Sequence, residues 1–341
     1  MIYLDYNATA PLRAPALAAM TPWFGVPANP SAAHAGGQAA AMAVDRARTQ
    51  VAGLLGWPRD RIVFTSGASE SNATVLSRGR WVASAVDHPS VRQWCVAELP
   101  VDGQGVVSLD ALAAVEGVDG VSVMLANNET GVVQPIREVI RIARARGWKV
   151  HVDAAQAPGR VSLADLAGAD FVTLASHKIG GPQGMGALAV PPGDPSPHIR
   201  GAAQERGWRA GTHNVAGIVG FGAIAEQVAK EGLLSPARRD RLEAGLVALG
   251  GEVASVRAPR LPQTACVAFA DRLAPDVVMA LDLAGIQASA GSACSSGAAR
   301  PSAVLAAMGF AGSGIRFSMG IETTDAEIDA TIAAVARVLG R

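Results

Sequence analysis

The chain has 341 residues, of which 50% are hydrophobic and 17% are charged, with 29 basic against 29 acidic side chains. This length favours two domains, and the balanced charge excludes the basic surface expected of a nucleic-acid-binding or membrane-surface protein. The N-terminus lacks the basic start and apolar core of a signal peptide, and the longest apolar run, near residues 215–225, is too short to span a bilayer. We therefore expect a cytoplasmic protein whose partners are small molecules or other proteins.

The three cysteines, Cys95, Cys266 and Cys294, are an odd number without zinc-type spacing. This pattern argues against a disulfide framework and a metal site, and it leaves room for one reactive thiol. Apolar neighbours favour core positions for Cys95 and Cys266. Cys294 stands in the Gly-, Ser- and Ala-rich run GSACSSG, which favours a mobile, accessible thiol.

The first 14 residues contain a short strand-like stretch, and we expect them to form an arm outside the main sheet that reaches the active site. A loop at residues 26–37 precedes a predicted helix over about residues 38–55. Residues 61–64 then predict a buried strand, and a turn rich in small and hydroxyl residues leads into a helix that ends near Leu76. The unpaired N–H groups and the dipole of such a helix start suit a phosphate, and Ser69 adds a hydroxyl.

Strand and helix patterns alternate from residue 81 to residue 190, which predicts a mainly parallel sheet with helices on its faces. Ligands of such sheets gather at the carboxyl ends of the strands. Five polar residues fall at predicted strand ends and are expected to converge on one crevice: His88, Asn128, Asp153, Gln156 and Lys178. We assign residues 15–232 to this large domain.

The regular alternation of predicted strands and helices ends near residues 233–236. Before this point lie a Pro-rich loop, a polar segment at residues 200–212 and a long helix over about residues 214–231. After it come a helix at residues 237–249, a strand at 264–269, a helix at 276–284 and the segment that holds Cys294. Residues 233–341 are therefore expected to form a smaller α+β domain.

Lys178 lies between an apolar strand and a glycine-rich turn, where a bound group can approach it closely. Together with Asp153 and the predicted phosphate cradle, it meets three requirements of pyridoxal 5'-phosphate: a lysine for a Schiff base, a carboxylate for the pyridine nitrogen and a site for the phosphate. His88 offers a ring for stacking, and Asn128 and Gln156 offer donors for the phenolic oxygen. Taken one by one, the lysine is more simply a surface lysine, His88, Asn128 and Gln156 are more simply satisfied turn residues, and the helix start is equally well an ordinary cap.

Nine motifs occur in order along nearly the whole chain: YLDYNATAP from Tyr3, NPSAAHAGG from Asn29, IVFTSGASES from Ile62, NNETGVVQP from Asn127, HVDAAQ from His151, SHKIGGPQGMGAL from Ser176, ERGWRAGT from Glu205, GSACSSG from Gly291 and GIRFSMG from Gly314. On these motifs the chain resembles the NifS- and IscS-like cysteine desulfurases, class V members of the fold-type I pyridoxal phosphate enzymes. The resemblance implies an α/β fold with a mainly parallel, seven-stranded-type sheet in a large domain and a smaller α+β domain.

The resemblance also implies roles for individual residues. Lys178 is the Schiff-base lysine, Asp153 the partner of the pyridine nitrogen, and His88 the stacking acid and base. The remaining roles are cofactor contacts by Asn128 and Gln156 at the ring oxygen and by Ala68, Ser69 and His177 at the phosphate, a substrate-carboxylate clamp by Arg316, and a position close to the substrate for Asn7. Thr212 matches a residue that reaches the phosphate of the neighbouring subunit, which implies a homodimer with shared sites.

The implied reaction takes sulfur from L-cysteine, leaving L-alanine and a persulfide on Cys294. A protein acceptor, such as an iron–sulfur scaffold or a sulfurtransferase, then receives the sulfur for iron–sulfur cluster or other thio-cofactor biosynthesis. The resemblance also allows Cys294 a role as a transient iron–sulfur ligand.

Several positions depart from the family pattern. Ala175 replaces a phosphate-binding serine, for which Ser176 is the nearest substitute, and Asn72-Ala73 replaces an acidic-Asn pair. Gly180 replaces an aromatic residue, residues 202–204 replace a Gly- and His-rich run, and the chain lacks the longer tail used for scaffold docking, so we expect an unusual acceptor. Two alternatives stay open: another class V enzyme, either an aminotransferase or a selenocysteine or cysteine lyase, which would not need Cys294, and a non-catalytic binding homologue.

Overall fold

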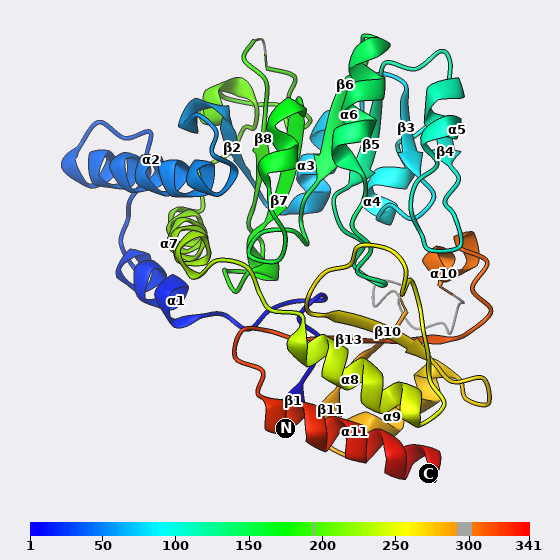
Figure 1. Ribbon diagram of the computed structural model, residues 1–341. Helices are drawn as coiled ribbons and strands as arrows, with labels where there is room; N and C mark the ends of the chain where they lie inside the picture. The colour runs from blue at the N-terminus through cyan, green and yellow to red at the C-terminus, as the bar shows by residue number, and fades with distance from the viewer. Residues whose placement is uncertain (194, 292–301) are drawn as a thin grey trace.

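A seven-stranded sheet forms the larger lobe of the computed structural model, which describes residues 1–193, 195–291 and 302–341 (Figure 1). In this sheet β8 runs antiparallel to both neighbours, and the other contacts are parallel. The expected mainly parallel seven-stranded sheet is confirmed. Its strands lie in the order β2 (Ile62–Thr65), β8 (Gly186–Ala189), β7 (Phe171–Ala175), β6 (Lys149–Asp153), β5 (Gly120–Met124), β3 (Trp81–Ser84) and β4 (Ala97–Leu99).

Helices cover both faces of this sheet. Successive side chains of each strand point to opposite faces and therefore pack into two different hydrophobic clusters. Ile62 and Phe64 of β2 face one hydrophobic cluster, whereas Val63 faces another. The first cluster contains α2 (Ala35–Leu55), α6 (Ile136–Ala145) and α7 (Val215–Glu231), and the second contains α3 (Ala68–Leu76) and α4 (Pro89–Arg92).

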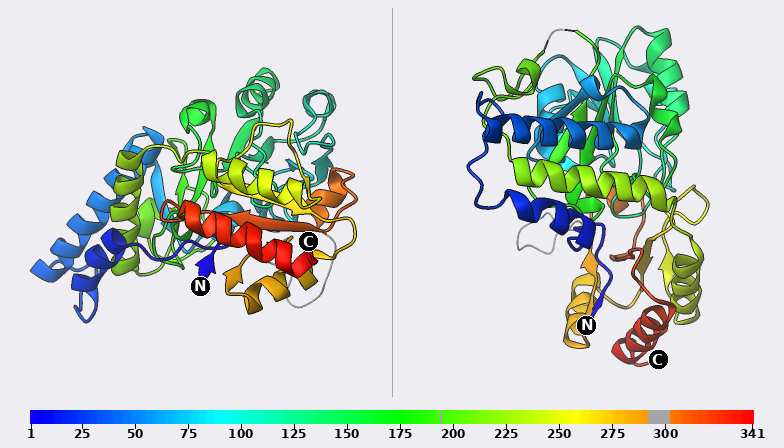
Figure 2. Two further views of the ribbon diagram at one scale, coloured as in Figure 1. Left: turned by 60° about the horizontal axis from the view of Figure 1, so that its bottom comes forward. Right: turned by 90° about the vertical axis from the view of Figure 1, so that its left-hand side faces the viewer.

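The long helices of the first cluster have clear sequence-encoded ends. The side chain of His34 caps α2, which stops at Gly56 in the left-handed region at φ 65°, and Asn214 caps α7. Figure 2 shows α2 and α7 packed side by side, with α1 (Ala14–Met20) next to α7. The short α5 (Leu109–Ala114) packs against α6.

The smaller lobe has an antiparallel sheet in the order β12 (Ser289–Ala290), β13 (Gly314–Ser318), β10 (Thr264–Ala268) and β9 (Glu252–Val253). Its core includes residues of α8 (Ala237–Ala248), α9 (Ala274–Leu283) and α11 (Asp325–Leu339), and α11 begins with a complete capping box between Thr324 and Glu327. The helix α10 (Ala303–Ala307) contributes to a small separate cluster. Short 3-10 helices are η1 (Thr21–Trp23), η2 (Arg59–Arg61), η3 (Ala164–Gly168), η4 (Ser176–Lys178) and η5 (Gln204–Gly207).

The N-terminal arm connects the two lobes. Its strand β1 (Ile2–Tyr3) pairs in parallel with β11 (Ile286–Gln287), and Asp5 bridges to Ser318 of the smaller lobe. The arm then crosses to the larger lobe, where the Arg13 N–H donates to the Gly180 carbonyl, and both chain ends lie on the smaller lobe (Figure 1). Lys178 and the first residues of the chain are thereby brought together.

Candidate active site

A cavity of about 600 Å³ lies at the carboxyl ends of β5, β6 and β7. Its walls come from the large sheet, the N-terminal arm and β13. A volume of this size suits a cofactor together with a small substrate. Ten predicted site residues line it: Asn7, Ala68, Ser69, His88, Asn128, Asp153, Gln156, His177, Lys178 and Arg316.

Lys178 ends η4, immediately after β7. Its Nζ donates to the backbone carbonyls of Asn7 at 2.6 Å and Ala8 at 2.8 Å, so the amine is half-buried against the N-terminal arm. The turn that follows depends on glycine: a Cβ on Gly181 would lie 2.1 Å from the Ser176 hydroxyl oxygen, and Gly180 has φ 87°. The glycines predicted to allow close approach are therefore also needed to shape the lysine turn.

Asp153 is the last residue of β6, and its carboxylate is held by two donors. Oδ1 accepts from the Ala155 N–H at 3.0 Å, and Oδ2 accepts from the Asn72 side-chain amide at 2.9 Å. With the residue only 6% exposed, a ring nitrogen that carries a proton would find a fixed anionic partner in this wall of the cavity.

The segment predicted to bind a phosphate is the start of α3. Gly67, Ala68 and Ser69 line the cavity at this helix start, as does Glu70, which pairs with Arg209 at 3.1 Å. This ion pair limits the repulsion that the Glu70 carboxylate would exert on a bound phosphate. The helix start therefore offers both backbone donors and a favourable dipole.

His177 borders the same cavity and contacts the N-terminal arm, with Nδ1 lying 3.2 Å from the Thr9 hydroxyl. Burial, followed by the charges of Lys178 and Arg160, lowers the pKa of His177 to about 4. The ring is therefore neutral near physiological pH, and it can offer an N–H to an anion in the cavity without adding a full charge.

Arg316 projects from β13 and is 2% exposed. Its Nη2 donates to Asp5 at 2.6 Å and its Nη1 to the Asn128 carbonyl at 3.1 Å, while the buried Nε finds no acceptor among the described residues. A buried guanidinium with donor capacity left in the cavity is suited to a carboxylate of a substrate.

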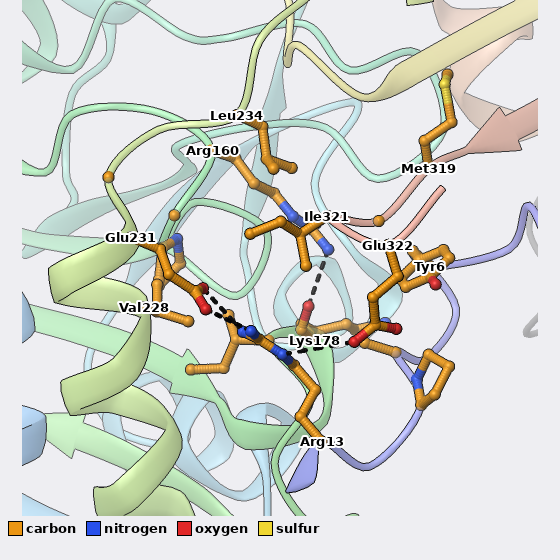
Figure 3. A pocket seen from close by; sticks show the side chains of 17 residues that line it. Tyr6, Arg13, Arg160, Lys178, Val228, Glu231, Leu234, Met319, Ile321 and Glu322 are labelled. Carbon is orange, nitrogen blue, oxygen red and sulfur yellow. Dashed lines mark hydrogen bonds and ion pairs between the residues drawn. The ribbon is translucent and has the colours of Figure 1, made fainter. Parts of the chain in front are cut away.

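Arg160 lines a smaller cavity of about 70 Å³ together with Lys178, which lines both cavities (Figure 3). Figure 3 shows its guanidinium directed at the Lys178 backbone, to whose carbonyl Nη2 donates at 2.9 Å. Its Nη1 also contacts the side chains of Gln156 and Asn7. In the same small cavity, Arg13 forms ion pairs with Glu231 and Glu322.

Two predicted site residues do not line the cavity. Thr212 lies exposed in the segment before α7, and Cys294 lies outside the described residues. Ser176 does not replace the phosphate contact expected at Ala175, because its side chain is fully buried and faces Gly181 instead of the cavity.

The other two cysteines differ in their surroundings. Cys266 is buried as predicted, whereas Cys95 is only half-buried, and burial raises the pKa of each thiol to about 12. Within the described ranges, no group of three or more His, Cys, Asp and Glu side chains is arranged to hold a metal ion, and no helix is long and apolar enough to cross a membrane.

Comparisons with known proteins agree on one family. The model of the aminotransferase class-V family matches residues 2–331. The chain belongs to the class V aminotransferase family. A cysteine desulfurase of Cereibacter sphaeroides is 42% identical, with 96% of this chain and 93% of that protein aligned, and the cysteine desulfurase NifS of Azotobacter vinelandii is 38% identical, with 100% and 93% aligned.

Solved structures agree with these relatives. A NifS-like protein from Rickettsia africae has a TM-score of 0.90 at 30% identity and covers all of both chains, at 100% each. The structure described as SspA in complex with cysteine has a TM-score of 0.81 at 29% identity and covers 94% of this chain and 99% of that one. The resemblance to the NifS- and IscS-like cysteine desulfurases is therefore confirmed, as is the predicted fold class.

The structure of this class V chain adds site residues that the sequence did not single out. Arg160 and Asp5 contact predicted site residues, and Ser90 lines the cavity beside His88. Asn72 appeared only as a departure from the family pattern, yet it contacts Asp153 directly. Only Ser90 carried a local signal, because a serine two residues after a histidine at a helix start is placed to contact it.

Proposed function

We propose that this protein is a cysteine desulfurase that uses pyridoxal 5'-phosphate to take sulfur from L-cysteine. The observation that carries the proposal is the meeting of Lys178, Asp153 and the α3 start in one cavity of about 600 Å³. An amine, a buried carboxylate and a helix N-terminus are the donor set that the aldehyde, the pyridine nitrogen and the phosphate of this cofactor require. The residues present therefore fit the group.

When bound, the cofactor withdraws electrons from the substrate Cα and thereby loosens the bonds at Cα and Cβ. The protein residues supply the rest. Asp153 would hold a proton at the ring nitrogen, His88 would contact the ring, and Arg316 would bind and orient the substrate carboxylate, since all three line the cavity. Lys178 lines the cavity, and once its Nζ leaves the carbonyls of Asn7 and Ala8 the neutral amine would remove the Cα proton.

Sulfur transfer is assigned to Cys294, since its thiolate can attack the substrate sulfur. An S–S bond forms as the Cβ–S bond breaks, and the electron pair of that bond stays on carbon, which takes up protons and leaves as L-alanine. Carbon is reduced as sulfur is oxidised to the persulfide level, so no external oxidant is needed. A thiol of a protein acceptor, or a small thiol in vitro, then removes the sulfur.

We further propose that the protein works as a homodimer in the cytoplasm and delivers sulfur to a protein acceptor. The exposed position of Thr212, away from the cavity of its own chain, supports a role for this residue in the site of a partner subunit.

The Cys294→Ala variant tests the proposal against the other class V reactions. We expect it to retain cofactor binding and to lose cysteine-dependent formation of alanine and persulfide, because the attacking thiolate is gone. Cys95→Ala is the matched control and keeps full activity, since Cys95 does not line the cavity. Unchanged turnover in Cys294→Ala would favour a lyase or an aminotransferase, and a purified protein that binds no cofactor would favour a binding homologue.

A further inference from the structure

Four side chains form a continuous hydrogen-bonded path from Asp153 to His88. The Asn72 side-chain amide donates to Asp153 Oδ2 at 2.9 Å and to the Ser90 hydroxyl oxygen at 3.0 Å. That oxygen lies 2.8 Å from His88 Nδ1. Asn72 is fully buried, and Ser90 and Asp153 are 8% and 6% exposed, so little water competes with these contacts.

The charge of Asp153 fixes the orientation of the Asn72 amide. An ionised carboxylate only accepts hydrogen bonds, so the NH₂ group of Asn72 has to face it. The reverse orientation would place the amide oxygen against the carboxylate oxygen, with no hydrogen between them. The same NH₂ group donates to Ser90, whose hydroxyl oxygen is therefore already used as an acceptor.

The next hydrogen bond of the path joins the Ser90 hydroxyl to His88. The hydroxyl, whose oxygen accepts from Asn72, donates its own hydrogen to His88 Nδ1, because the backbone N–H of Ser90 also donates to this nitrogen and leaves it without a proton. The backbone N–H of Ser90 points at the same nitrogen, at 3.1 Å, because His88 caps the start of α4. A ring nitrogen that accepts from two donors carries no proton, so the neutral ring has its proton on Nε2.

We propose that Asn72 and Ser90 are positioning residues that hold His88 in the Nε2–H tautomer, with the direction set by the carboxylate of Asp153. The consequence for catalysis rests on the proposed function: His88 donates a proton from Nε2, and the group that pairs with the cofactor nitrogen also orients the ring stacked on the cofactor. The tautomer itself is a property of the protein alone.

Nitrogen NMR of the full chain labelled with 15N-histidine tests this directly, both without and with pyridoxal phosphate. The His88 signals are identified by their loss in His88→Gln. We expect Nδ1 at the position of an unprotonated ring nitrogen and Nε2 at that of a protonated one. A proton on Nδ1 in the native protein would overturn the proposal.

The isosteric variant Asn72→Asp should reverse the donor and acceptor roles along the path. Two adjacent carboxyl groups share a proton, so the introduced carboxyl group donates to Asp153 and accepts from Ser90, which then turns its lone pairs toward His88. We expect the Nδ1 signal to move toward the protonated position. The exposed Asn29→Asp is the control and leaves the His88 spectrum unchanged. A folded Asn72→Asp protein, by circular dichroism, with a native His88 spectrum would show that the backbone N–H of Ser90 alone sets the tautomer, which refutes the proposed role of Asn72 and Asp153.

Activity gives a separate readout. Ser90→Ala removes the hydroxyl step and should lower cysteine-dependent sulfide release about five-fold, the equivalent of one hydrogen bond of about 1 kcal/mol. Ser90→Thr keeps the hydroxyl and should restore the native rate. Equal rates in Ser90→Ala and Ser90→Thr would contradict a role of the Ser90 hydroxyl in positioning His88. If the native protein releases no sulfide, the proposed function fails while the NMR result still decides the tautomer.

Discussion

Arg160 illustrates how a single buried side chain organises this site. It is 6% exposed, and no carboxylate of the described residues lies within ion-pair distance. Burial, followed by the charge of Arg316, lowers the pKa of Arg160 to about 10, so the group stays a cation near physiological pH. Its donors go instead to the Lys178 carbonyl and to the side chains of Gln156 and Asn7. Three parts of the site are thereby tied to one planar group.

The variant Arg160→Lys should reduce the rate of alanine formation roughly ten-fold, because an ammonium keeps the charge but cannot reproduce the forked geometry. The reason lies in positioning, so cofactor content should change little. The exposed Arg337→Lys serves as the control. Steady-state rates equal to the native rate in Arg160→Lys would show that the fork is dispensable.

Local sequence context explains which of these residues could be predicted. Asp153 and Lys178 stand at strand ends, and the topology of a parallel sheet gathers strand ends at one edge. Arg160 and Asp5 act through partners 18 and 311 positions away in the chain, respectively. Contacts of this kind depend on how side chains of separate elements meet, which no periodicity or motif specifies.

At the level of elements, the segment η5 is held in an unusual backbone conformation by one carboxylate. Glu205 and Arg206 have φ 47° and φ 54°, which costs free energy for residues with a side chain. Glu205 accepts from Arg48 of α2 at 2.6 and 2.8 Å, from His213 at 2.8 Å and from the Phe64 N–H of β2 at 2.8 Å. These bonds fix the segment that leads to Thr212.

Glu205 also links stability to pH. Burial alone would raise its pKa, but the hydrogen bonds from Arg48 and His213, the Arg48 charge and the Phe64 N–H outweigh burial and lower the pKa to about 2 from 4.5. Since the pKa is lower in the folded state, the stabilisation is complete above about pH 4.5 and is lost as the pH falls toward about 2.

Glu205→Gln should therefore lower the free energy of unfolding by about 3 kcal/mol near neutral pH, since it leaves the buried Arg48 with only the exposed Asp45, at 3.7 Å, as a counter-ion. Urea unfolding monitored over a pH series measures this, and the gap between native and variant should narrow below about pH 4.5. The exposed pair of Glu98 and Arg92 gives the control, because Glu98→Gln should cost less than about 1 kcal/mol. A gap that does not depend on pH would contradict the assignment.

The elements themselves were predicted unevenly. Long periodic stretches such as α2 and α7, and a strand buried on both sides such as β2, were expected near their observed bounds. The short β4 and α5, between residues 97 and 114, were not. Elements of three to six residues are formed by packing against the sheet and against α6, so they carry little periodicity of their own.

For the whole molecule, Asn7 shows how the two lobes meet at the site. Its backbone N–H donates to the Ser318 hydroxyl at 2.9 Å, and its side-chain amide donates to Thr264 at 2.9 Å, both in the smaller lobe. Its carbonyl accepts from Lys178 and Gln156 of the larger lobe. The N-terminal arm therefore couples the lysine turn to the lobe that carries Arg316.

The proposed homodimer with shared sites predicts complementation between two inactive variants. Lys178→Ala removes the cofactor lysine from one chain, and Thr212→Glu places a negative charge where the partner's phosphate is expected to bind. A purified heterodimer of the two, carrying different tags, should recover about half of the native activity per dimer, since one of its two sites is intact. No recovery, with a dimer present by sedimentation, would mean that Thr212 does not serve the partner's site.

The most direct measurement of the central proposal follows the absorption spectrum of the purified protein on addition of L-cysteine, with alanine and sulfide quantified in the presence of a reducing thiol. The account predicts a visible band that Lys178→Ala abolishes, a change in that band on addition of L-cysteine, and one alanine for each sulfide. A band that changes without alanine, or a protein that lacks the band even after incubation with pyridoxal phosphate, would contradict it.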